Sequence, residues 1–120
     1  MGRSYRDLIA WQKGMDLADA IYDATEDFPK REIYGLASQL RRAAVSVPSN
    51  IAEGQSRLSG GPFRLFLGHA RASLAELETQ LEIARRRKFI TEARCEELKT
   101  RASEAGRLIN GLLESIQDRA

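Results

Sequence analysis

Apolar residues recur every three or four positions along most of this chain, and no other feature of the sequence limits its fold as strongly. The first series consists of Leu8, Trp11, Met15, Ala18, Tyr22 and Thr25. Such spacing places one apolar stripe along a helix. Proline interrupts the pattern within residues 28–31, and glycine together with proline interrupts it again within residues 59–62, because neither residue readily continues a helix.

Three further apolar series share this spacing. They comprise Leu36, Leu40, Ala44, Val47 and Ile51; Phe63, Phe66, Ala70, Leu74, Leu77, Leu81 and Ala84; and Cys95, Leu98, Ala102, Ala105, Ile109, Leu112 and Ile116. We therefore predict helices over about residues 5–27, 32–56, 62–88 and 91–118, with Pro62 at a first helical position and Thr91 as an N-cap. Helices of this length with short connections predict an all-α fold, a single-domain, antiparallel up-down-up-down four-helix bundle over residues 1–120.

Several apolar residues lie off these stripes. They are Ile9, Leu17, Ile21, Leu65, Ile83, Leu108 and Leu113. Either the core stripe is wide, or these residues form a second contact surface and the protein is a homo-oligomer.

The cysteine content and the apolar runs indicate a cytoplasmic protein. Cys95 is the one cysteine, so an internal disulfide is excluded and a reducing compartment is expected. Its place in the fourth apolar series predicts a small core residue. No apolar run approaches the ~20 residues needed to span a bilayer, and we expect no membrane partner.

Charge is unevenly distributed along the chain, although the formal net charge is only +2. Residues 5–27 contain two basic and six acidic residues, whereas residues 33–90 contain nine basic and four acidic ones. This asymmetry predicts either a basic face or a head-to-tail attraction between subunits.

Residue types needed for catalysis are scarce. Di-iron bundles use Glu-x-x-His pairs, but the one histidine, His69, follows Phe66 at that spacing. Ser46 and Ser73 lie within predicted helices, with no strained turn to expose a nucleophile. We expect a protein that is not an enzyme and that uses no metal or cofactor.

The second helix carries polar residues that a purely packing helix would not need. They are Arg41, Arg42, Ser46, Asn50, Glu53 and Arg57, and Pro48 lies among them. One interpretation is a hydrogen-bonded network between helices or subunits, and the other is a contact with a ligand or nucleic acid. If Asn50 and Glu53 form a buried network, Glu53→Ala should cost about 1–3 kcal/mol of stability.

A second set of cations lies on the third helix and provides a candidate nucleic-acid site. It comprises Arg64, Arg71, Arg85, Arg86, Arg87 and Lys88. Cations at a helix C-terminus also complement the helix dipole, which is the alternative explanation. Aromatic residues are not interleaved with these cations, so binding would follow the phosphate backbone and not the base sequence.

Three segments resemble a known bacterial family. They are WQKGMDLADAIYDATEDFP, EIYGLASQLRRAAVSVPSNIAEGQSR and FRLFLGHARASLAELETQLEIA. They resemble proteins encoded in intervening sequences of 23S ribosomal RNA genes, over about residues 8–90. The resemblance implies a four-helix bundle, a ring-like homopentamer and no enzymatic activity, with a mainly structural role for Arg41, Arg42, Asn50, Glu53, Gly54 and Arg57.

Relatives of that family include the accessory protein of diversity-generating retroelements, a basic barrel that binds a reverse transcriptase and nucleic acid. This chain departs from the family pattern at Arg87-Lys88-Phe89, where a Leu-Gly-Tyr-like turn is common, and at His69, where an aliphatic residue is usual.

Two functions are therefore expected. The first is a non-enzymatic oligomeric scaffold with a basic surface that binds RNA or DNA without sequence-specific readout. The alternative is a protein-only adaptor that docks a partner polypeptide, such as a reverse transcriptase, and has no direct role with nucleic acid.

Overall fold

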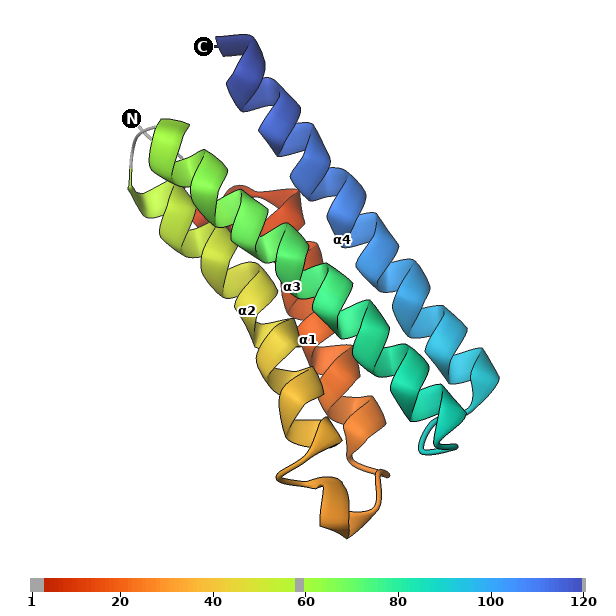
Figure 1. Ribbon diagram of the computed structural model, residues 1–120. Coiled ribbons are helices and arrows are strands. Elements are labelled where there is room, and N and C mark those ends of the chain that lie inside the picture. Colours follow the sequence, from red (N-terminus) through yellow and green to blue (C-terminus); the bar gives the residue numbers. More distant parts are fainter. Residues whose placement is uncertain (1–3, 58–59, 120) are drawn as a thin grey trace.

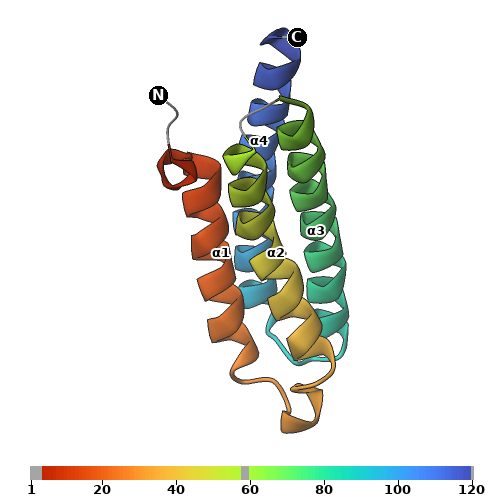
Figure 2. The same cartoon turned by 90° about the vertical axis from the view of Figure 1, so that its left-hand side faces the viewer.

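Four long helices lie side by side in the computed structural model, which describes residues 4–57 and 60–119 (Figures 1 and 2). In chain order the elements are η1 (Tyr5–Asp7), α1 (Ile9–Thr25), η2 (Lys30–Glu32), α2 (Leu36–Ser56), α3 (Gly60–Arg86) and α4 (Glu92–Arg119). Each long helix contacts its neighbours in the sequence, and α1 also contacts α4. The predicted all-α four-helix bundle is confirmed. None of the described helices is long and apolar enough to cross a membrane.

The first helix is shorter than predicted, because the backbone is extended at Leu8 (φ −76°, ψ 126°) between η1 and α1. The second helix begins at Leu36 and not at residue 32. Pro29 leads into the short η2, and the Glu32 carboxylate then accepts a hydrogen bond from the Leu36 N–H at 3.0 Å. A side chain at residue 35 would meet this carboxylate, with its Cβ 2.8 Å from Oε1, so Gly35 leaves room for the cap.

The last two helices differ from the predicted bounds by one or two residues at each end, since α3 ends at Arg86 and α4 spans Glu92–Arg119. Helix α3 begins at Gly60, so Pro62 is its third residue and not its first. Proline is still accepted there, because the first-turn N–H groups of a helix have no intrahelical partner. The predicted N-cap of α4 is confirmed, since Thr91 Oγ1 accepts a hydrogen bond from the Arg94 N–H at 3.1 Å.

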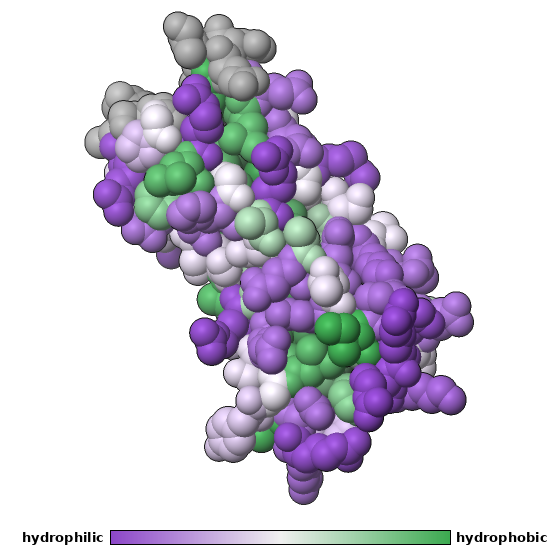
Figure 3. All heavy atoms as spheres, viewed as in Figure 1, coloured by the Kyte–Doolittle hydropathy of each residue, from purple (hydrophilic) through white to green (hydrophobic). Residues whose placement is uncertain are grey.

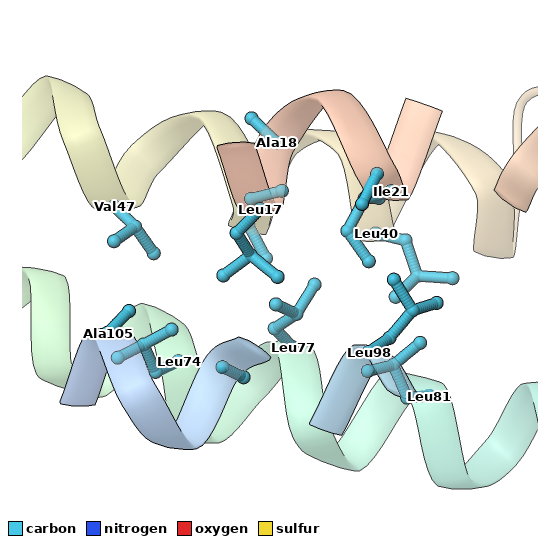
Figure 4. Close-up of a cluster of buried hydrophobic side chains, with 14 of the residues drawn as sticks. Leu17, Ala18, Ile21, Leu40, Val47, Leu74, Leu77, Leu81, Leu98 and Ala105 are labelled. Carbon is cyan, nitrogen blue, oxygen red and sulfur yellow. The ribbon is translucent and has the colours of Figure 1, made fainter. Parts of the chain in front are cut away.

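The core stripes of α2, α3 and α4 follow the prediction, but the stripe of α1 does not. Leu17 and Ile21 are fully buried, whereas Met15 and Tyr22 are 40% and 43% exposed. Figure 4 shows Leu17 and Ile21 extending from α1 into the space faced by Leu77 and Leu98. The buried face of α1 therefore lies nearly a quarter turn around the helix from the predicted stripe. The predicted stripe runs along the flank of α1 that faces α2.

The off-stripe residues divide into two groups. Leu17 and Ile21 belong to the core, and Leu108 and Leu113 pack partly buried against it. Ile9, Leu65 and Ile83 remain exposed, which leaves them available for a contact outside the single chain. Figure 3 shows hydrophobic patches near both ends of α3 on an otherwise largely hydrophilic face.

Cys95 is buried in the core as predicted. Its thiol lies 3.6 Å from the Leu81 carbonyl, and burial raises the pKa of the thiol above its usual value. A thiol with a raised pKa and no exposure is a poor nucleophile. Cys95 therefore serves packing.

Candidate nucleic-acid interface

The α1–α2 connection and the α3–α4 turn meet at one end of the bundle (Figures 1 and 2). The rings of Phe28 and Phe89, one from each connection, lie with centroids 5.7 Å apart. The Arg31 guanidinium lies over the Phe89 ring at 5.8 Å. Two segments that are about sixty residues apart in the sequence therefore form one continuous surface.

The α3–α4 turn has the hydrogen bonds of a Schellman motif. The Phe89 N–H bonds the Ala84 carbonyl at 2.9 Å, and the Lys88 N–H bonds the Arg85 carbonyl at 3.0 Å. This motif requires a left-handed residue, and Lys88 takes that position with φ 63°. Among the described residues other than glycine, Lys88 is the one with a positive φ. Glycine is the usual choice because a Cβ costs about 1–2 kcal/mol in this conformation.

Glu82 forms ion pairs with part of the predicted basic run. Its carboxylate bonds the Arg85 guanidinium and the Lys99 ammonium, the latter at 2.8 Å, and lies 3.7 Å from Arg86 Nε. The hydrogen bonds from Arg85 and Lys99 lower the pKa of Glu82 to about 2. The same hydrogen bonds raise the pKa of both cations. Arg85 and Lys99 thus join α3 to α4, and Arg85 is less available to an outside partner than predicted.

The remaining cations at this end form a group that we call the basic end. It comprises Lys30, Arg31, Arg86, Arg87 and Lys88, all of them exposed. Four of the five have no carboxylate within ion-pair distance among the described residues, and Arg86 keeps 75% of its side chain exposed beside Glu82. The connections at this end, residues 27–34 and 86–92, also carry Asp27, Glu32 and Glu92, so their formal charge is +2.

Only part of the basic end was predicted from the sequence. Arg86, Arg87 and Lys88 were among the predicted nucleic-acid-binding cations, whereas Lys30 and Arg31 were assigned to the segment that ends the first helix. Their proximity to Arg87 and Lys88 depends on the antiparallel pairing of the helices and on the Phe28–Phe89 contact. The signal available in the sequence was that both connections carry adjacent cations.

Arg64 and Arg71 lie away from the basic end. Fifteen residues of helix separate Arg71 from Arg86, which corresponds to about 22 Å. Arg71 Nη1 donates to Asn110 Oδ1 at 3.1 Å, across a groove that Arg64 and Leu113 also line. Glu78 and Glu82 line the next part of the same helix pair. The six predicted cations therefore do not form one uninterrupted stripe.

The polar residues of α2 are likewise distributed over separate contacts. Arg41 donates from Nε to Thr25 Oγ1 at 2.8 Å and lies over the Tyr22 ring at 4.7 Å, so it joins α2 to α1. A 3.7 Å ion pair with Glu26 completes this group. Arg42 is exposed and makes no ion pair among the described residues.

Ser46 contacts α3 instead, and Asn50 bonds Ser46. The hydroxyls of Ser46 and Ser73 lie 2.8 Å apart, and Asn50 Nδ2 donates to the carbonyl and the hydroxyl of Ser46, each at 2.8 Å. Hydrogen bonds of this kind hold one helix register against its neighbour. The interpretation of a network between helices is therefore supported for Ser46, which bonds Ser73 of α3, a partner that the sequence interpretation did not include. Asn50 joins this contact only through Ser46 of its own helix.

Glu53 and Arg57 form a third, exposed group. Their side chains make an i,i+4 ion pair at 3.0 Å, and the Arg57 guanidinium lies 5.2 Å from the centroid of the Phe66 ring. No hydrogen bond joins Glu53 to Asn50 in the described part of the chain. The expected cost of 1–3 kcal/mol for Glu53→Ala is therefore corrected to below about 0.5 kcal/mol, the usual worth of such a surface pair.

Comparison with known proteins places the chain in a family. The model described as 23S rRNA-intervening sequence protein matches residues 6–111. The chain belongs to that family. A crystal structure from Bacteroides thetaiotaomicron, of a protein with unknown function from the S23 ribosomal protein family, is similar in fold. Its TM-score is 0.78 at 22% identity, with 87% of this chain and 97% of that chain covered. No curated protein matches the sequence.

Within this member of the 23S rRNA-intervening sequence family, the residues weighed for catalysis have ordinary surroundings. His69 is exposed and makes an edge contact with the Phe66 ring, with centroids 5.8 Å apart. Ser73 is occupied by its bond to Ser46. Among residues 4–57 and 60–119, no group of three or more His, Cys, Asp or Glu side chains is placed to hold a metal ion.

Proposed function

We propose that this protein is a non-enzymatic oligomeric scaffold whose basic end contacts the phosphate backbone of RNA or DNA without reading base sequence. The observation that carries the proposal is the convergence of Lys30, Arg31, Arg87 and Lys88 from two connections that are distant in sequence. Exposed cations that lack carboxylate partners can exchange bound counterions for phosphates, which is the main source of non-specific affinity for nucleic acid.

The conformation of Lys88 supports the same proposal. A left-handed lysine costs stability that glycine would not, and it occupies a position where the resembling family commonly has glycine. Residues kept in unfavourable conformations tend to mark functional sites. A charge retained at that cost fits a role in which the ammonium group contacts an anion.

Assembly into a ring-like homo-oligomer, a pentamer by resemblance to the family, is the second part of the proposal. Leu65 and Ile83 are 58% and 45% exposed, and their separation of eighteen residues, five whole turns, puts them on one side of α3. The exposed aspartates Asp16, Asp19 and Asp23 lie on α1, which is diagonal to α3 in the bundle. The exposed cations Arg64 and Arg71 lie on α3 beside the apolar residues, so basic charge on one side of the bundle and acidic charge on the other favour a repeated head-to-tail contact.

A salt series tests the phosphate contact. Fluorescence anisotropy is measured with a labelled RNA hairpin, a DNA duplex and a single strand between about 50 and 200 mM salt. We expect affinity to fall steeply with salt, and Arg86→Gln/Arg87→Gln to reduce the slope of log K against log salt by about 2 on duplex DNA. Arg42→Gln/Arg101→Gln removes the same charge elsewhere and should leave the slope unchanged.

Two results would contradict the proposal. The first is an absence of binding at the lowest salt concentration, and the second is an equal loss of slope in both double variants. The first would favour the protein-only adaptor, for which the exposed apolar residues of α3 provide a docking surface. The second would mean that the phosphate contacts are not confined to the basic end.

A further inference from the structure

Tyr34 is the most exposed large apolar side chain in the described part of the protein, with 95% of its surface accessible. It lies between η2 and α2 in the connection that supplies Lys30 and Arg31. The neighbouring Ile33 is 55% exposed. Sequence analysis treated Tyr34 only as part of a motif and found no aromatic residue interleaved with the cations. The fold supplies that aromatic residue.

Packing of the bundle does not account for Tyr34. Phe28, in the same connection, is buried and contacts Phe89, so it closes this end of the core. Leu36 and Ala37 begin the buried stripe of α2 immediately after Tyr34. The Tyr34 hydroxyl makes no hydrogen bond to the described residues. A polar residue would therefore satisfy the local structure equally well.

Tyr34 shares its connection with two exposed cations. Lys30 and Arg31 precede it by four and three residues, whereas the carboxylate of the intervening Glu32 is occupied by the Leu36 N–H. A flat ring beside phosphate-binding cations matches how single-stranded nucleic acid is held, with a base stacked on the ring and the backbone against the charges. Stacking on an aromatic ring tolerates any base, because each base presents a π face.

We infer that Tyr34 stacks on an unpaired base, so that the preferred ligand is single-stranded RNA or DNA, or a loop, and not an uninterrupted duplex. This inference rests on the proposed function and specifies its ligand. A protein contact fits the surroundings less well, because the basic end beside this small apolar pair includes Lys30 and Lys88, and lysine is depleted in the cores of protein interfaces.

Substitutions of Tyr34 separate stacking from charge. Anisotropy is measured with a twelve-nucleotide oligothymidine, a duplex of equal length and an RNA hairpin with a pyrimidine loop. We expect Tyr34→Ala to weaken single-strand and hairpin binding about tenfold, the usual scale for one stacked base, and to leave duplex binding and all salt slopes unchanged. Tyr34→Phe keeps the ring and should retain affinity, whereas Tyr34→Leu keeps apolar area without the ring and should behave as Tyr34→Ala.

The outcomes distinguish the inference from the function on which it rests. Salt-dependent binding that Tyr34→Ala leaves intact, or weakens equally for single strand and duplex, overturns the stacking role while the phosphate contact stands. Failure of the unaltered protein to bind any of the three ligands overturns the proposed function itself. Light scattering is run on every variant, and a smaller assembly for Tyr34→Ala would assign Tyr34 to a subunit contact and overturn the inference.

Discussion

Lys88 lowers the stability of the fold but adds a positive charge to the basic end. The Schellman turn after α3 needs a left-handed residue, and that geometry is set by the Phe89 and Lys88 backbone hydrogen bonds to Ala84 and Arg85. A lysine side chain adds nothing to those bonds and is strained by the positive φ. The ammonium group, which is exposed at the basic end, is what distinguishes lysine from glycine there.

Replacing Lys88 by glycine should therefore stabilise the fold. The relief of about 1–2 kcal/mol is partly offset by the larger entropy of glycine in the unfolded chain, about 0.5–1 kcal/mol. We expect a net gain of about 0.5–1 kcal/mol, measured by urea unfolding. Arg87→Gly, at a residue with an ordinary φ, is the matched control and should lose stability. A loss in Lys88→Gly would contradict the strain assigned to this turn.

Glu82 provides a second residue-scale prediction, for pH. Its pKa is about 2 in the folded protein and near 4.5 without its cations, so the carboxylate contributes stability that is present above pH 4.5. That contribution is lost as the pH falls toward 2. We expect Glu82→Gln to be less stable than the unaltered protein at neutral pH, with the difference shrinking between pH 4.5 and 2 in thermal melts. A constant difference across that range would mean that the charge is not responsible.

At the scale of the helices, a glycine explains how closely α2 packs against α3. A Cβ on Gly14 of α1 would reach the Pro48 ring at 3.4 Å, an ordinary contact distance. A Cβ on Gly54 of α2 would lie 2.9 Å from Phe66 Cβ and 3.0 Å from Phe63 Cδ1. Pro48 thus interrupts the hydrogen bonding of α2 at a point where its ring fills the contact with α1.

Gly54→Ala should destabilise the bundle. The added methyl group forces the α2–α3 contact apart or displaces Phe66, and overpacking of this kind costs about 1–3 kcal/mol. Gly68→Ala is a matched control, because a Cβ there meets nothing within 4 Å, and it should gain up to about 1 kcal/mol from helix propensity. Chemical unfolding of both variants checks the pair, and equal effects would contradict the close approach.

The accuracy of the sequence analysis also varied between helices. For residues 36–51 and 95–109 the spacing predicted the buried face of the helix correctly, because leucine, isoleucine and alanine occur there almost exclusively on one side. In α1 the large residues Trp11, Met15 and Tyr22 form a regular series on the flank beside α2, while small residues such as Ala10 and Gly14 complete the true buried face. Residue size was a misleading guide where α1 approaches Pro48 closely.

The candidate site was less predictable than the core, for a related reason. Residues within one helix were assigned from their spacing, but Ser73 and Lys30 acquire their roles from segments that are distant in sequence. Spacing could indicate the i,i+3 pair of Glu82 with Arg85 but not the bond from Lys99 to Glu82, because that bond needs α4 beside α3. Local periodicity determines which face a residue occupies, whereas the pairing of helices determines its neighbours.

For the whole molecule, the proposed oligomer leads to a test of the apolar side of α3. Light scattering should give a mass several times that of the 13.4 kDa chain. Leu65→Glu/Ile83→Glu should reduce that mass toward a single chain, because charges would be buried in the contact. Val45→Glu, at a residue of α2 that is 42% exposed, is the control and should keep the mass. A monomeric unaltered protein would remove the oligomeric part of the proposal.

The two connections that form the basic end lie at the same end of the bundle. This placement determines where the basic ends would lie in a ring-like oligomer. Rotation about a single axis preserves direction along that axis, so bundles standing parallel to it would present every basic end on one rim. A strand crossing that rim would meet the same weak site repeatedly, and each later contact would form at a high effective concentration. A modest affinity per chain would then suffice for tight and readily reversible retention of a flexible nucleic acid.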